Sequence, residues 1–170
     1  QTYATTEEVI AVSRVAADSG GIYTSHLRKE GIGLLDGVAE AIRIGKETGM
    51  PVVLTHHKAI GKAMWGASVK TLAMIEAARA AGQDVMADQY PYTASSTSFN
   101  VLAPAWAFAG GDSAFTRRAK DPALRDSIVN GIVDILENDR GGGDLHRVQF
   151  ASVSWKRDLQ GRTLYDWAVE

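Results

Sequence analysis

The feature that most constrains this chain is the alternation of short apolar runs with amphipathic segments, at a period of about 30 residues. Apolar runs at residues 22–26, 52–54 and 85–88 predict strands, and helical patterns separate them. Parallel strands need connections of this length, because the chain must return to the same end of the sheet before the next strand begins. The alternation therefore predicts parallel βα units over residues 1–92.

Local signals place the helices of these units. Thr5 and Glu8 have the spacing of a capping box and begin a first helix. A second helix is expected between Gly33 and Gly49, and a third over residues 68–81. The run at residues 52–54 is continuously apolar, which predicts a strand covered on both faces.

The alternation stops after Tyr92. The Asp121-Pro122 pair predicts the start of a helix, residues 148–153 alternate like a half-buried strand, and a last helix is expected near Thr163. We therefore expect two parts, namely partial β/α-barrel units at residues 1–92 and a small α+β insertion at residues 93–170 that returns toward the barrel. The predicted fold class is α/β, a partial TIM-like (β/α) barrel segment of about three parallel βα units.

Two histidines occupy equivalent places in successive units. His26 and His56 each close an apolar run and lie 30 residues apart. Equivalent positions of successive βα units lie at the same rim of a barrel, and the C-terminal rim carries the chemistry in such folds. Two imidazoles at this rim are a candidate metal pair, although a single strand-end histidine is more often a hydrogen-bonded core residue. His57 must face the other way and is expected to be structural.

Four further residues near this rim are candidates for other roles. Arg28 and Lys58 each follow their histidine by two residues, so they either hold a substrate carboxylate or form ordinary salt bridges. Asp88 has nearly the same phase as the histidines and either fixes an imidazole tautomer or caps the following loop. Tyr90, in the stiff Tyr-Pro-Tyr sequence, is either a substrate wall or packing beneath the insertion.

Composition excludes several classes of function. The chain has 170 residues, a net charge of −2 and no cluster of Lys or Arg, so neither nucleic acid nor a membrane surface is an expected partner. The absence of Cys removes disulfides and thiolate metal sites, and no signal peptide is recognisable, so a cytoplasmic location is expected. Because the chain begins at Gln1 and ends within an apparent helix, it is expected to be a piece of a larger protein.

At these residues the chain resembles the N-acyl-D-amino-acid deacylases (D-aminoacylases) of the amidohydrolase superfamily. The resemblance lies in several ordered motifs within residues 20–111. These motifs are Ser25-His26-Leu27-Arg28-Lys29-Glu30-Gly31, the segment from Pro51 to Gly61 that contains Thr55-His56-His57-Lys58, Trp65-Gly66, and Asp88-Gln89-Tyr90-Pro91-Tyr92-Thr93-Ala94-Ser95-Ser96-Thr97.

This resemblance implies a zinc-dependent hydrolase that cleaves the amide bond of N-acyl-D-amino acids with metal-activated water. His26 and His56 match metal ligands, Lys58 and Tyr90 match substrate-contacting positions, and Arg28 is expected to help orient the substrate. The family's remaining metal ligands and its catalytic Asp are not in this sequence, so no catalytic residue is expected here. Two histidines alone are expected to bind zinc weakly, and the isolated chain is expected to be inactive.

Two alternatives stay open. The first is a cyclic amidohydrolase of the hydantoinase or dihydroorotase type, against which the Tyr-Pro-Tyr motif argues. The second is a non-catalytic module that self-associates, because a few parallel strands leave unpaired edges that recruit another chain.

Overall fold

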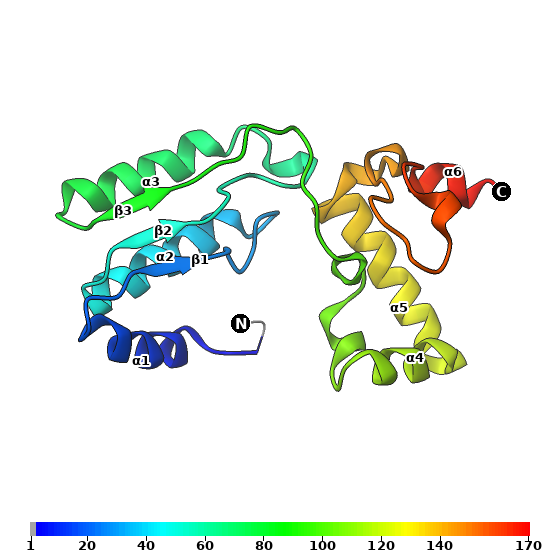
Figure 1. Ribbon diagram of the computed structural model, residues 1–170, viewed down its shortest axis with the longest axis horizontal. Helices are drawn as coiled ribbons and strands as arrows, with labels where there is room; N and C mark the ends of the chain where they lie inside the picture. Colours follow the sequence, from blue (N-terminus) through cyan, green and yellow to red (C-terminus); the bar gives the residue numbers. More distant parts are fainter. Residues whose placement is uncertain (1–2) are drawn as a thin grey trace. The chain divides into compact units, whose positions relative to one another are not determined.

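Short parallel strands form the centre of the first half of the protein. The computed structural model describes residues 3–170, and in it β1 (Tyr23–Ser25), β2 (Val52–Leu54) and β3 (Val85–Ala87) pair in that order. Tyr23 lies beside Val52, which in turn lies beside Val85. The sheet is open, with β1 and β3 at its edges (Figure 1). The α/β class and the parallel pairing are as predicted.

The described residues divide into two compact units. The first unit contains the chain as far as Ile60 together with Met64–Tyr92, and the second contains Gly61–Ala63 together with Thr93–Glu170. In the first unit, α1 (Thr6–Ala17) packs beside α2 (Leu34–Thr48), and α2 packs beside α3 (Ser68–Ala80) (Figure 1). The predicted capping box begins α1, and Gly49 ends α2 in the left-handed conformation.

The core of the first unit lies between the sheet and the helices α2 and α3. Apolar positions three or four residues apart on each helix face the buried side chains of the strands, as expected of amphipathic helices. The buried members of this cluster are Leu27, Leu34, Val38, Ala41, Val52, Leu54, Ile75, Ala78 and Val85.

The face of the sheet opposite α2 and α3 is partly exposed, although cover on both faces was predicted. Val52 and Leu54 are fully buried, but Val53 between them is only half-buried, and Met86 on β3 is 42% exposed. The described residues of this unit therefore cover one face of the sheet and leave the other partly open. The continuous apolar run predicted cover on both faces, and that prediction was wrong for the described part of the chain.

A close approach of α2 fixes the loop that follows β1. Gly37 is buried in α2, and a Cβ atom at this position would lie 2.8 Å from the carbonyl oxygen of Lys29. Only glycine lets the helix backbone lie this near the loop backbone. The loop that carries residues 26–30 is thereby held against the helix.

The second unit is mostly helical. It contains α4 (Asp112–Lys120), α5 (Pro122–Asp134), which begins at the predicted Asp121-Pro122 pair, and α6 (Leu164–Ala168), which begins at a capping box formed by Thr163 and Asp166 (Figure 1). A π-helical turn (Ile135–Asp139) continues α5. Over residues 3–170, the short 3₁₀ turns are Lys62–Met64, Phe99–Leu102, Ala105–Phe108, Gly141–Gly143, Leu145–Arg147 and Arg157–Leu159.

One sequence expectation for this unit was wrong, and one of its helices was not expected. The alternating segment at residues 148–153 is not a strand, because it makes only an isolated antiparallel bridge between Gln149 and Thr163. Helix α4 was not predicted at all. Within the described residues, every helix is too short or too polar to cross a lipid bilayer.

Candidate metal and substrate site

His26 and His56 lie together at the carboxyl ends of neighbouring strands. His26 directly follows β1, and His56 follows β2 after one residue. The strand pairing continues past β2, because the Thr55 amide donates to the Ser25 carbonyl at 3.1 Å. The two imidazoles stack with their centroids 4.4 Å apart, and Nδ1 of His26 contacts Nε2 of His56. The structure thus brings the two predicted ligands to one point.

The backbone of His56 has an uncommon conformation. Its φ is 43°, in the left-handed region that non-glycine residues seldom adopt. Asp88, which follows β3, supports this conformation by accepting the His56 amide proton on Oδ1 at 2.5 Å. The Asp88 carbonyl also accepts the next amide, that of His57, at 2.8 Å. Asp88 therefore holds the backbone of His56, a role that differs from both alternatives weighed from the sequence.

His57 is turned toward helix α3. Its Nε2 lies 2.8 Å from the hydroxyl of Thr71, which is fully buried. Burial lowers the pKa of His57, with an opposing effect from Glu30 and a reinforcing one from Lys58. A neutral imidazole packed on a buried threonine matches the structural role expected for His57.

A carboxylate and an ammonium lie beside His56. Glu30 Oε1 is 2.7 Å from Lys58 Nζ and 3.0 Å from His56 Nδ1. Lys58 Nζ is itself 2.8 Å from the same Nδ1. No role for Glu30 was predicted from the sequence. The signal was present, because Glu30 is the acidic residue in the short loop that follows His26 at the same rim.

Tyr90 borders this cluster. Its ring centroid lies 6.4 Å from that of His56, and Lys58 Nζ lies 5.9 Å from the Tyr90 ring. Tyr92 is tilted against Tyr90 at a centroid distance of 6.4 Å. Lys58 and Tyr90 therefore flank one of the two histidines.

Unlike Lys58, Arg28 is paired with a carboxylate of helix α2. Its Nε and Nη2 donate to the carboxylate of Glu40 on α2 at 2.8–3.1 Å, and Glu40 also accepts from the Thr6 hydroxyl at 2.7 Å. The hydrogen bonds from Arg28 lower the pKa of Glu40, and the same pair raises that of Arg28. The guanidinium ties the loop after β1 to α2, so the substrate-binding role predicted for Arg28 requires this pair to open.

The donor atoms present fit part of a zinc shell. Zinc accepts imidazole nitrogen, and Nδ1 of His26 and Nε2 of His56 face one another across a single point. Over residues 3–170, however, no group of three or more His, Asp or Glu side chains forms a metal-binding set. The structure therefore offers two convergent nitrogen ligands, whereas a catalytic zinc ordinarily has three protein ligands.

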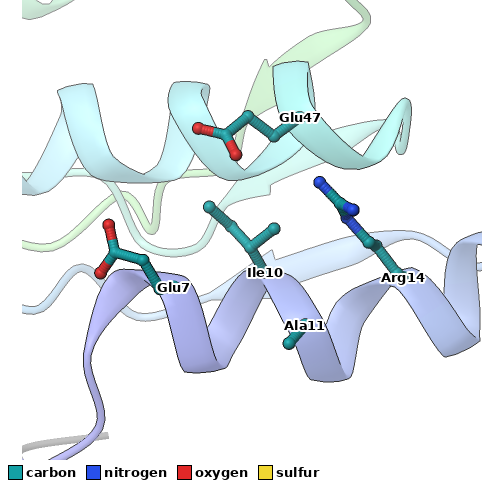
Figure 2. A pocket seen from close by; sticks show the side chains of 5 residues that line it. All are labelled: Glu7, Ile10, Ala11, Arg14 and Glu47. Atoms are coloured by element: carbon teal, nitrogen blue, oxygen red, sulfur yellow. The ribbon is translucent and has the colours of Figure 1, made fainter.

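A surface cavity of about 390 Å³ lies away from these histidines, between α1 and α2 (Figure 2). Glu7, Ile10, Ala11 and Arg14 of α1 line it together with Glu47 of α2. Arg43 donates to both Glu7 and Glu47, at 3.0 and 2.7 Å. Because its carboxylates are bound by a neighbouring cation and none of its residues is a predicted site residue, this cavity does not belong to the candidate site.

Known proteins resemble about half of this chain most strongly. A D-aminoacylase of Alcaligenes xylosoxydans xylosoxydans is 50% identical over 94 residues, which are 55% of this chain and 19% of that protein. The crystal structure of a D-aminoacylase, described as defining a novel subset of amidohydrolases, matches 98% of this chain and 27% of its own at 32% identity, with a TM-score of 0.66. The chain is related to the D-aminoacylases.

An N-acyl-D-glutamate deacylase from Bordetella bronchiseptica, solved with zinc and a phosphonate inhibitor, also matches 98% of this chain and 27% of its own. It is 29% identical, with a TM-score of 0.68. No family model matches the sequence. The alignment with the curated D-aminoacylase covers about a fifth of that protein's length. The family resemblance drawn from the sequence motifs is confirmed, and its neighbours are amidohydrolases.

Proposed function

We propose that this chain carries two metal ligands and part of the substrate rim of a zinc-dependent hydrolase that cleaves the amide bond of N-acyl-D-amino acids. The observation that carries the proposal is the convergence of His26 Nδ1 and His56 Nε2 at the carboxyl ends of neighbouring parallel strands. This is the position at which β/α barrels hold their active sites. In the same proposal, the three βα units are a segment of such a barrel, and residues 93–170 are an insertion on it.

Each rim residue has a part in the proposed reaction. His26 and His56 would hold the metal, which when bound lowers the pKa of a water molecule and polarises the scissile carbonyl. Lys58 would exchange its pair with Glu30 for the carboxylate of the substrate, and Tyr90 would form the wall beside it. We assign no general acid–base role to any residue of this chain. With only two protein ligands, zinc binding is expected to be weak unless other groups complete the shell.

The proposal is tested by zinc titration of the 170-residue protein. Calorimetry should detect one weak zinc site, and replacement of either histidine (His26→Asn or His56→Asn) should abolish it. His146→Asn is the matched control, because His146 belongs to the second unit and its ring is tilted against that of Tyr165. Zinc binding that survives both single replacements would contradict the proposal. A panel of N-acyl-D-amino acids and cyclic amides, offered to a protein with a complete metal shell, separates the deacylase from the cyclic amidohydrolase.

The open sheet favours self-association as a second property. β1 and β3 are the edge strands of the described sheet, and Met86 on its partly open face is 42% exposed. Unpaired strand edges and exposed apolar side chains promote pairing with another chain. We propose a dimer of this chain, measurable by light scattering at micromolar concentration. A strictly monomeric protein would rule this out.

A further inference from the structure

Glu30 faces two different hydrogen-bond donors at the candidate metal site. Its Oε1 lies 2.7 Å from Lys58 Nζ and 3.0 Å from His56 Nδ1. The three side chains are mostly buried, with 15% of Glu30, 18% of Lys58 and 23% of His56 exposed. The Ile60 amide donates to the Glu30 carbonyl at 2.9 Å, so the backbone that carries this carboxylate is also fixed. Glu30 is thus held in place beside His56.

One nitrogen of His56 is shared by competing partners. A lysine ammonium can only donate, and a carboxylate can only accept. If Nδ1 accepts from Lys58, whose Nζ is 2.8 Å away, the proton of the neutral ring resides on Nε2. If Nδ1 instead donates to Glu30, Nε2 carries a free lone pair directed at the point shared with His26. Only the second tautomer can bind a metal through Nε2.

We propose that Glu30 is a positioning residue that keeps His56 in the tautomer with the proton on Nδ1. This inference rests on the proposed metal site and adds to it the group that selects the ligand's tautomer. A metal-bound histidine usually donates its second N–H to a carboxylate or carbonyl, which fixes both tautomer and ring orientation. Asp88 is not the carboxylate that accepts the ring proton of His56, because it accepts the proton of the His56 backbone amide. Glu30 is the carboxylate within reach of the ring.

Nitrogen-15 NMR of the histidine side chains tests the tautomer directly, at a fixed pH of about 8, where imidazole is ordinarily neutral. In the wild-type protein, Nδ1 of His56 should give the signal of a protonated nitrogen and Nε2 that of an unprotonated one. Among the contacts described for Nδ1 of His56, Glu30→Ala leaves the one with Lys58, and the proton should move to Nε2. Glu30→Gln keeps an acceptor oxygen and should preserve the wild-type tautomer. Lys58→Met removes the competing donor and should also preserve it.

Zinc affinity supplies a second, separate readout. Loss of the carboxylate in Glu30→Ala should weaken zinc binding by about 10- to 100-fold, and Glu30→Gln by less. Glu40→Ala is the matched control, because Glu40 is 16% exposed and paired with Arg28 but does not contact either imidazole. It should leave the His56 tautomer unchanged and affect zinc binding less than Glu30→Ala does.

The outcomes separate this inference from the proposed function. A wild-type spectrum with the proton on Nε2 of His56 overturns the role of Glu30 without any variant having to fold. An unchanged tautomer in a folded Glu30→Ala protein also overturns it, as does an equal effect in Glu40→Ala. If the wild-type protein fails to bind zinc while the tautomer still depends on Glu30, the metal proposal fails and the positioning role stands.

Discussion

Replacement of Gly37 by alanine should disturb both the stability of the first unit and its candidate site. In a helix interior, exchange of glycine for alanine alone should stabilise the fold by about 1 kcal/mol. Here the new Cβ would lie 2.8 Å from the Lys29 carbonyl oxygen and 3.4 Å from Leu27 Cβ. The nearest of these atoms is backbone, which yields less readily than the end of a flexible side chain.

Overpacking of a tight interior contact costs about 1–3 kcal/mol. Because the contact at Gly37 is with backbone, the upper part of this range applies, about 2–3 kcal/mol. Subtraction of the helix-propensity gain leaves a net loss of about 1–2 kcal/mol in the free energy of unfolding. The loop at residues 26–30 must also shift away from α2, so zinc affinity at the two histidines should fall in the same variant.

Urea denaturation followed by circular dichroism measures the stability change. Ala39→Gly is the matched control, because Ala39 is exposed on the same helix and isolates the propensity difference, expected as a loss of about 1 kcal/mol. If Gly37→Ala is as stable as the wild type or more so, while Ala39→Gly shows its ordinary loss, the close approach of helix and loop does not exist as described.

Two further predictions concern pH. Hydrogen bonds from Arg28 hold the pKa of Glu40 below its usual value. The stability that this pair contributes should therefore be present above the ordinary glutamate pKa and be lost as pH falls through the lowered value. In urea unfolding, Glu40→Gln should be less stable than the wild type at pH ~7 but not at pH ~3. Burial lowers the pKa of His57, so the free energy of unfolding should decline as pH falls below the ordinary histidine pKa of about 6.5. His57→Gln should reduce the dependence of the free energy of unfolding on pH in this range. An unchanged dependence would show that His57 is not buried as a neutral ring.

The sequence located the first unit well because its signals are local. The strand at residues 52–54 and the start of the helix at Ser68 agree with β2 and α3, since apolar periodicity and punctuating glycines act within a few residues. The alternation at residues 148–153 was equally local, but a strand needs a partner, and Gln149 finds only the single bridge to Thr163. Helix α4 was not predicted, although Asp112 in its first turn and the basic residues in its last turn are favourable helix-end signals.

The sequence predicted which two histidines lie together, but it did not predict the partners of the side chains around them. The phase of the strand ends placed His26 and His56 together, because equivalent positions of parallel strands meet at one edge. Arg28 and Lys58 have the same spacing from their histidines, yet Arg28 binds Glu40 and Lys58 binds Glu30. A long cationic side chain pairs with whichever carboxylate the tertiary fold brings within reach, and sequence spacing alone does not predict which carboxylate that is.

The left-handed backbone of His56 has a consequence for evolution and engineering at this position. Glycine adopts such a conformation freely, and asparagine, aspartate and histidine adopt it more often than other residues, so few replacements at position 56 would leave this turn unstrained. Histidine is one of these few residues, and it also supplies a nitrogen that can bind a metal. Asparagine at position 56 should keep the turn intact while removing the ring, which makes it the least disruptive way to silence the site.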